Sequence, residues 1–290
     1  DILKLNEITV KSGLINESFS ESTSSLSVMQ QKDIRDSRTD HFNEIVDRIS
    51  NLNWAGGTSR PRYFQIRGVG ERSQYFGEGS PNFSIGYSLD DIDLSGLGML
   101  GQLFDLNQIE IFKGPQSSIF GSNAIGGLIS LRSNKPSNKN IYRYSITVGN
   151  DGKRGVNGLV NFKIIQNLML RISSGYNYSN GFRKNNYLNL DNSNKKDELF
   201  VRAKLLFTPF KHFSLLGTVI SADFKNGYDA WAPDNNDQFL TYSDSEGEDS
   251  QNTNAGSLKL HYQFSNNLFI KAISSYSVNH QTHSYDGDWA

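Results

Sequence analysis

Three carboxylates lie close together in the sequence, at Asp90, Asp91 and Asp93. Hydrolysis of a glycosidic bond uses two carboxyl groups that face each other across the sugar, one as the acid and one as the base or nucleophile. Nothing in the sequence places two of these three across a cleft, and acidic residues directly after an apolar run are typical of a turn. We therefore expect a turn here, no catalytic residues and no enzymatic activity.

Other chemically suggestive residues also lack the required spacing. Gly68-Val69-Gly70 has no following helix and no Gly-x-x-Gly continuation, so it is not a dinucleotide loop. His280 and His283 are three apart, which on a strand places them on opposite faces and makes them a poor metal pair. The absence of cysteine excludes thiolate metal sites and cysteine nucleophiles. We expect no cofactor and assign no metal site, although the acids between residues 226 and 254 leave Ca²⁺ binding open.

The bulk composition excludes two further classes of protein. The chain has 290 residues and a net charge of -1, so it has no basic surface suited to nucleic acid. It contains no run of 18 or more apolar residues that would predict a transmembrane helix. A transmembrane β-barrel is not excluded by that test, because its strands alternate apolar and polar residues. The first residues lack the features of a signal peptide, so we expect an exported protein to be present here in processed form.

The sequence divides into three regions that must position any site. Residues 1–40 form a polar arm with short β-like runs at 7–10 and 24–29. Residues 41–138 mix short apolar runs with many glycines, which predicts a small α+β domain. Within it, the apolar spacing of 41–49 predicts a helix, with Asp40 as its cap. Residues 139–290 change to a period of two, which predicts β-strands.

We expect seven long antiparallel strands in this last region. They are predicted around residues 142–148, 156–164, 168–178, 201–207, 213–224, 258–264 and 268–278. Tight turns are expected at 166–167, 209–212 and 265–267, whereas 180–196 and 226–254 are long polar loops. Long strands with short turns on one side and long loops on the other are typical of an outer-membrane barrel. A soluble β-sandwich explains the alternation but neither the strand length nor the loop asymmetry.

The strongest local motif runs from Ile109 to Ile129, IEIFKGPQSSIFGSNAIGGLI. It resembles the plug signature of TonB-dependent receptors: a strand of mixed charge, a Gly-Pro turn, a loop of small residues and a Gly-Gly-apolar strand. Gly114 and Gly121 permit turns with positive φ, and Gly126-Gly127 permit close backbone packing. A generic strand-turn-strand is the alternative interpretation.

Two more stretches support the same resemblance. Residues 62–70 resemble the Ile-Arg-Gly strand of the family, and 85–92 resemble a plug strand that ends in an acidic turn. Asp90-Asp91 replaces the commoner Asp-Gly, which leaves the turn geometry open. The resemblance covers the whole chain, by motif in the plug and only by pattern in the strands. It implies an α+β plug domain followed by about 7 of the roughly 22 strands of a plugged transmembrane barrel, and so a fragment of the receptor.

The resemblance also implies particular site residues. Glu7, Ile8, Thr9 and Val10 resemble a TonB box, an extended segment that can add as a strand to the edge of a partner's sheet. Arg67 and Lys113 match plug cations that form a latch with carboxylates on the barrel wall, with solvated strand charges as the alternative. Ligand contacts are expected at the plug apex and outer loops. The candidates are Arg72, Tyr75, Phe76, Glu78, Phe83, Tyr228 and Trp231.

The resulting functional hypothesis is TonB-dependent import of a scarce ligand across the outer membrane of a Gram-negative bacterium. The family implies TonB with its inner-membrane energising complex as a partner, together with outer-membrane lipid and an extracellular small ligand. An iron-siderophore chelate is the first choice, with oligosaccharide, haem and vitamin B12 as alternatives, because loops carry no readable ligand code. A soluble β-rich carbohydrate-binding protein is the alternative from another class.

Overall fold

The computed structural model describes residues 8–10, 17–71, 83–97, 100–121 and 123–290. The chain forms two compact units, one made of Asp1–Ala55 with Arg62–Asn134, the other of Gly56–Pro61 with Lys135–Ala290. In the described ranges, no helix has both the length and the apolar character to cross a membrane. The division places the short segment 56–61 with the later strands, although its sequence neighbours belong to the first unit.

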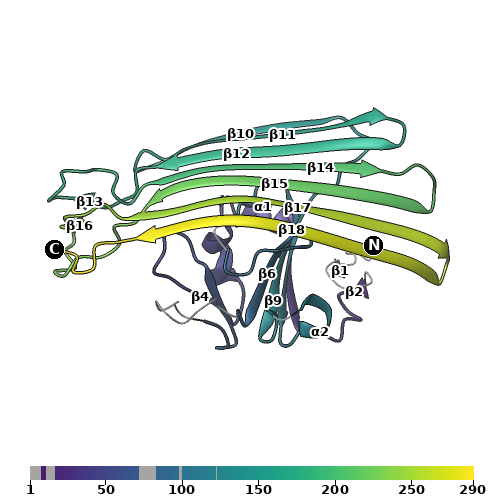
Figure 1. The fold of residues 1–290 in the computed structure, drawn as a ribbon, viewed down its shortest axis with the longest axis horizontal. Coiled ribbons are helices and arrows are strands. Elements are labelled where there is room, and N and C mark those ends of the chain that lie inside the picture. The colour runs from purple at the N-terminus through teal and green to yellow at the C-terminus, as the bar shows by residue number, and fades with distance from the viewer. Residues whose placement is uncertain (1–7, 11–16, 72–82, 98–99, 122) are drawn as a thin grey trace, which may run out of the picture. The chain divides into compact units, whose positions relative to one another are not determined.

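The first unit is built on a mixed five-stranded sheet with the order β3-β8-β9-β6-β7 (Figure 1). Its strands are β3 (Leu26–Gln30), β6 (Ile85–Leu89), β7 (Ile92–Asp93), β8 (Leu106–Lys113) and β9 (Gly127–Ser133). The strands β6 and β9 pair in parallel, and the other neighbours are antiparallel. Together with its helices, this sheet confirms the predicted α+β plug fold.

The first unit also contains smaller elements. They are β1 (Thr9–Val10), β2 (Glu17–Ser18), α1 (Gln31–Asp36), the 3₁₀ helix η1 (Phe42–Arg48), β4 (Leu52–Ala55), β5 (Tyr63–Ile66) and α2 (Ser117–Phe120). The helix predicted over 41–49 is thus present as η1, but Asp40 does not cap it. His41 is the cap residue, because its Nδ1 accepts a hydrogen bond from the Asn43 amide at 3.2 Å.

Aromatic rings form much of the core of the first unit. Phe42 lies edge-on to Phe64 with ring centroids 5.6 Å apart, and Phe64 stacks on Tyr87, also at 5.6 Å. All three side chains are buried. Burying each of these side chains stabilises the fold by roughly 1.5–3 kcal/mol. Phe42 belongs to the apolar face of the 41–49 segment, so its burial accounts for the apolar spacing from which the helix was predicted.

The glycines of the plug-like motif have the roles expected from the sequence. Gly114 and Gly121 have φ of 134° and 87°. A Cβ on Gly127 would lie 2.5 Å from the carbonyl oxygen of Phe112, and a Cβ on Gly126 would lie 2.7 Å from Cγ1 of Val69. The two adjacent glycines therefore allow close backbone packing.

The second unit contains a seven-stranded antiparallel sheet in simple sequence order. Its strands are β10 (Ile141–Val148), β11 (Arg154–Ile165), β12 (Leu168–Ser179), β14 (Lys196–Phe207), β15 (Phe213–Gly227), β17 (Glu248–Ser265) and β18 (Leu268–Ser284). All seven predicted strands are present, and the short turns lie where expected. A two-residue parallel pair, β13 (Lys184–Asn185) with β16 (Leu240–Thr241), joins the two long loops.

The last predicted loop is shorter than the sequence suggested. The segment 226–254 was expected to be a loop, but β15 extends to Gly227 and β17 begins at Glu248. These ends carry polar residues on both faces, so they lack the apolar alternation that marks the rest of each strand. They pair nevertheless, for example Ser221 with Asn254 and Asp223 with Asn252.

The two faces of the seven-stranded sheet differ in polarity. One row across neighbouring strands is mainly apolar, and the adjacent row is polar. The first row is Val160, Ile172, Ala203, Val219, Gly256 and Tyr276. The second is Asn161, Arg171, Lys204, Thr218, Ser257 and Ser275. On the apolar face, Val219 is 62% exposed and Tyr276 is 75% exposed, so this face is exposed in spite of its apolar character.

Candidate functional site

The segment Gly56–Pro61, which links β4 to β5, belongs to the second unit. Its sequence, Gly-Gly-Thr-Ser-Arg-Pro, combines residues that favour irregular backbone, so it forms a loop rather than extending the hairpin. The Thr58 hydroxyl donates to the Arg60 carbonyl at 2.5 Å, which fixes the local turn. We call this segment the 56–61 loop.

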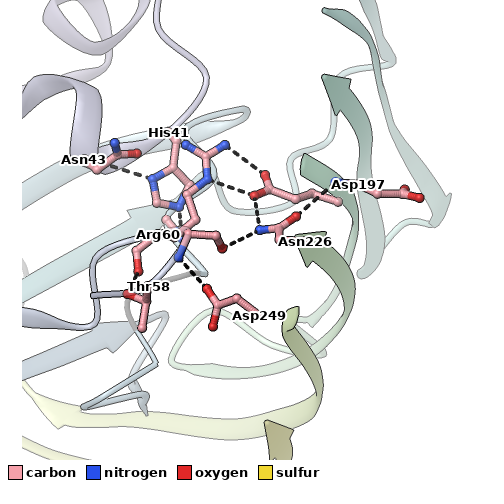
Figure 2. Close-up of polar contacts among 10 residues, drawn as sticks. His41, Asn43, Thr58, Arg60, Asp197, Asn226 and Asp249 are labelled. Carbon is pink, nitrogen blue, oxygen red and sulfur yellow. Dashed lines mark hydrogen bonds and ion pairs between the residues drawn. The ribbon is translucent and has the colours of Figure 1, made fainter. Parts of the chain in front are cut away.

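Arg60 forms a bidentate ion pair with Glu198 of β14. Its Nε lies 2.8 Å from Oε1 and its Nη2 lies 3.0 Å from Oε2 (Figure 2). The two side chains are 7% and 2% exposed. Paired N–H donors on a planar guanidinium match the two carboxylate oxygens, so the contact fixes orientation as well as distance.

Ser59 adds two further hydrogen bonds (Figure 2). Its backbone N–H donates to Asp249 Oδ2 at 2.6 Å, and its hydroxyl accepts from Asn226 Nδ2 at 2.9 Å. Asn226 Nδ2 also donates to Glu198 Oε1 at 3.1 Å. The partners come from three neighbouring strands, β14, β15 and β17, and we call Glu198, Asn226 and Asp249 the docking row.

The register of the sheet brings the docking row together. Asn226 pairs directly with Asp249, and Asp249 pairs with His283 of β18. The carboxylate of Asp249 is fully buried, and its Oδ1 lies 3.2 Å from Nδ1 of His283. One loop is therefore tied to three adjacent strands by buried, charge-assisted contacts. Such an arrangement holds a segment in place.

Sequence reasoning did not find this loop. The Gly-Gly-Thr-Ser-Arg-Pro composition predicts a loop, but nothing in it identifies Glu198 as the partner of Arg60, 138 residues away. The pairing depends on the register of β14 and β15. The available signal was period-two patterning, which places Glu198 on the face of β14 opposite the apolar one.

The two predicted latch cations lie together in the first unit. Arg67 Nη1 donates to the Lys113 carbonyl at 3.0 Å, and its Nη2 donates to the Ser25 hydroxyl at 2.7 Å. Lys113 Nζ donates to the hydroxyl of Ser50 at 3.0 Å. Desolvation, and secondly the positive charge of Arg67, lower the pKa of Lys113. That these cations pair with wall carboxylates stays a prediction.

The predicted TonB box is described in part. Glu7 lies outside the described residues, and Ile8 accepts a hydrogen bond at its carbonyl from the Phe19 amide at 2.8 Å. Thr9 and Val10 form β1 and pair with the two residues of β2. Val10 is buried in a cluster with Phe112. These residues are extended, and their pairing with a partner's sheet stays a prediction.

Four of the predicted ligand contacts, Arg72, Tyr75, Phe76 and Glu78, lie outside the described residues. Phe83 stacks on Tyr63 with centroids 6.2 Å apart. Burial raises the pKa of Tyr63, the charge of Arg62 lowers it and that of Glu71 raises it.

Tyr228 and Trp231 belong to a group of rings in the second unit. Tyr228 lies 4.7 Å from the His283 ring and 6.0 Å from Trp289, and Trp231 lies 6.2 Å from Trp289. The structure thus brings both predicted residues to one place and adds His283, Tyr285 and Trp289, which the sequence analysis did not select.

A buried carboxylate lies beside these rings in the sequence. Asp229 is 2% exposed and accepts from the side chains of Asn185, Thr241 and Ser243. It therefore joins the loop after β12 to the loop after β15. Across the described part of the chain, no three or more His, Asp or Glu side chains are grouped so that they could hold a metal ion.

The turn predicted at Asp90-Asp91 is confirmed, and its geometry explains the carboxylates. Both residues have positive φ, 53° and 69°, and Leu89 pairs with Ile92 across them. Short acidic side chains tolerate this conformation. Asp90 accepts from the Ser133 amide and hydroxyl at 2.9 and 2.6 Å, and Asp91 lies 2.7 Å from Arg132. The carboxylates thus link the hairpin to β9.

Residues 18–128 match the family model described as the TonB-dependent Receptor Plug Domain. Among solved structures, the chain is similar to the ferric yersiniabactin uptake receptor FyuA from Yersinia pestis, with 15% identity, a TM-score of 0.82 and coverage of 92% of this chain and 43% of that one.

Two further structures agree with that fold. The receptor FpvA from P. aeruginosa, bound to heterologous pyoverdines, gives 14% identity, a TM-score of 0.78 and coverage of 97% and 38%. BauA, the ferric preacinetobactin receptor from Acinetobacter baumannii, gives 15%, 0.74, 95% and 40%. The chain spans about two fifths of the length of these receptors.

Proposed function

We propose that this chain is part of a TonB-dependent receptor that imports a scarce ligand across the outer membrane of a Gram-negative bacterium. The match of residues 18–128 to the plug domain carries this proposal. A passive porin has no such domain. A soluble β-protein would not leave the apolar face of the seven-stranded sheet exposed.

A receptor of this kind needs contacts that open and re-form during transport. The 56–61 loop of the second unit suits this requirement, because it is fixed by an ion pair and hydrogen bonds rather than by a large apolar contact. Polar contacts of this kind can be exchanged for water once a pulling force opens them, whereas apolar burial favours return to the closed state. We assign the resting contact to Arg60 with Glu198 and Ser59 with Asp249.

Energy coupling is assigned to residues 7–10. In this proposal TonB, powered by its inner-membrane complex, adds to the arm as a neighbouring strand. The support is local: β1 and β2 pair over only two residues each, and short pairings open easily.

The proposed ligand is an iron chelate. The support comes from the similar solved structures, which are a ferric yersiniabactin uptake receptor, FpvA bound to pyoverdines and a ferric preacinetobactin receptor. Oligosaccharide, haem and vitamin B12 stay alternatives within the family. Growth of a strain lacking this receptor, tested over iron chelates and glycans, identifies the ligand as the compound whose uptake is lost.

Deletion of residues 7–10 tests the coupling. We expect ligand binding to purified receptor to be unchanged and uptake by whole cells to be abolished. A control variant replaces Ser20–Thr23, in the same arm, with a Gly-Ser segment of equal length and should keep uptake. Uptake that persists without residues 7–10 would sink the assignment of the box, and a receptor that remains in the aqueous fraction on membrane extraction would favour the soluble alternative.

A further inference from the structure

Five rings gather at the end of the seven-stranded sheet that carries the long loops. In Figure 1 this end of the sheet is the one at β13, β16 and the C-terminus of the chain. We call them the ring cluster: Tyr228, Trp231, His283, Tyr285 and Trp289. Tyr285 and Trp289 are stacked, with an interplanar angle of 14° and centroids 5.5 Å apart, and Tyr228 lies edge-on to both.

Two rings of the cluster are exposed and three are half-buried. Trp231 is 49% exposed and Tyr285 is 44% exposed, whereas Tyr228, His283 and Trp289 are half-buried. Large rings left in contact with water at a fixed place are a common feature of binding surfaces. The position of the cluster is fixed from below, because Asp229, next to Tyr228, is tied to Asn185, Thr241 and Ser243.

The segments that carry the rings supply acids, whereas the cations come from other segments. Arg60, whose neighbour Ser59 contacts Asp249 beside His283, is paired with Glu198, and Lys184 of β13 is paired with Asp191. The segments 226–258 and 272–290, which contain all five rings, have no Lys or Arg; their charged residues are acids, with His280 and His283 as the only titratable bases. Asp286 Oδ2 accepts from the Asp244 amide at 3.1 Å, and its Oδ1 accepts from the Asp288 amide at 3.3 Å. Desolvation raises the pKa of Asp286, but the hydrogen bonds from the backbone amides of Asp288 and Asp244 and its other hydrogen bonds together lower it more, so the net pKa is below the ordinary value.

This combination selects among ligand charges. An anionic group would meet carboxylates with no cation from either segment to offset them, so an anionic chelate face is disfavoured. A neutral sugar face would gain ring contact only. A cation gains both the attraction of the ring faces, up to about 2 kcal/mol when desolvated, and that of the carboxylates.

We propose that the ring cluster binds a cationic group of the imported ligand, an alkylammonium or a guanidinium. This inference rests on the proposed function only in calling that ligand imported; the binding itself does not depend on transport. Trp231, Tyr285 and Trp289 supply the ring faces, and Asp286 and Asp288 supply the opposite charge. The iron chelate proposed above would accordingly carry a positive group at its periphery.

The test compares three small probes of similar size on the complete, detergent-solubilised receptor: benzyltrimethylammonium, benzyl alcohol and benzoate. Calorimetry or saturation-transfer NMR gives their affinities. We expect the cation to bind about tenfold more tightly than the alcohol, and benzoate to bind more weakly than either. Equal affinity for the cation and the alcohol, or tighter binding of benzoate than of the cation, would overturn the proposal.

Variants locate the binding. Trp289→Ala should weaken benzyltrimethylammonium about fivefold to tenfold, and Trp289→Phe should retain most of the affinity. The control is Trp54→Ala, at an exposed tryptophan (44%) in the first unit, and it should change nothing. Asp286→Asn should reduce the preference for the cation over the alcohol and leave the alcohol unchanged.

The outcomes separate the two proposals. If the unsubstituted receptor is well folded and still transports its ligand but binds the cation no more tightly than the alcohol, the ring-cluster inference alone is overturned. Cation binding that survives deletion of residues 7–10, in cells that no longer take up ligand, supports both proposals. Cation binding by a receptor with no TonB-dependent uptake of any compound supports the inference and contradicts the proposed function.

Discussion

Arg60 and Glu198 illustrate how far a buried charge pair depends on both members. Each side chain is less than a tenth exposed, so neither charge is compensated by water as it would be at the surface. Removing one charge from such a pair typically costs 3–5 kcal/mol, far more than the net contribution of the intact pair. The 56–61 loop is therefore sensitive to charge even though it contains few apolar atoms.

Glu198→Gln tests this sensitivity to charge, since the substitution keeps the shape of the side chain and removes its negative charge. We expect the free energy of unfolding to fall by about 3 kcal/mol and the Ser59 amide, which donates to Asp249, to exchange its hydrogen faster. Denaturation and hydrogen-exchange mass spectrometry measure the two effects.

The matched control is Asp191→Asn. Asp191 also faces a cation, Lys184, at 3.3 Å, but these side chains are 78% and 64% exposed. Removing a charge there should change stability by less than about 0.5 kcal/mol. Equal effects of the two substitutions would show that burial does not govern the Arg60 pair.

Single residues were predictable from the sequence only where a local motif fixed them. Gly114, Gly121 and the Gly126-Gly127 pair could be assigned because positive φ and close backbone approach require glycine whatever the tertiary context. The partner of Arg60 could not, because it is set by strand register and by a long-range contact. The same holds for Trp289 in the ring cluster.

Among the elements, strands were predicted best where one face is apolar. The alternation placed all seven strands but not their full length. At the loop end, β14, β15, β17 and β18 all extend beyond the predicted bounds, most of all β17, where polar residues occupy both faces and no period-two signal remains. The 41–49 helix was located by its apolar stripe. Its 3₁₀ type and its His41 cap were not foreseen, because an imidazole acceptor is absent from the usual list of capping residues.

The contact between β8 and β9 depends on one missing side chain. A Cβ on Gly127 would meet the backbone oxygen of Phe112 at 2.5 Å, and backbone in a sheet cannot move aside without breaking its ladder. For Gly127→Ala we expect a loss of about 3 kcal/mol or more, the sum of the clash and of the strained φ. Urea denaturation measures it.

Gly114→Ala separates the two contributions. Gly114 also has positive φ, 134°, but nothing lies within 4 Å of its Cβ position. Only the conformational strain applies there, so we expect a loss of about 1–2 kcal/mol. Similar losses at both positions would mean that the close approach of the two strands can relax.

For the molecule as a whole, the sheet of the second unit carries the evidence for a lipid environment. Its exposed face is apolar along the middle of the strands and becomes polar toward the loop end, where Ser221 donates to Asn254 at 2.9 Å and Asn252 donates to Asp223 at 3.2 Å. A soluble sheet would cover such a face or make it polar. The change from apolar to polar along one strand therefore marks the edge of the proposed membrane band between Val219 and Ser221.

Two lysine substitutions on β15 test this boundary. Val219 and Ser221 are two residues apart in the strand, so their side chains point to the same face. Val219 lies between Ala203 and Gly256 in the apolar row and is 62% exposed. In a bilayer, Val219→Lys, just inside the boundary, should destabilise the inserted receptor by about 1–2 kcal/mol, whereas Ser221→Lys outside it should cost about 0–1 kcal/mol. Equilibrium folding into lipid vesicles measures both values. If this face met water instead, neither lysine would change stability by more than about 0.5 kcal/mol, and the difference between the two positions would vanish.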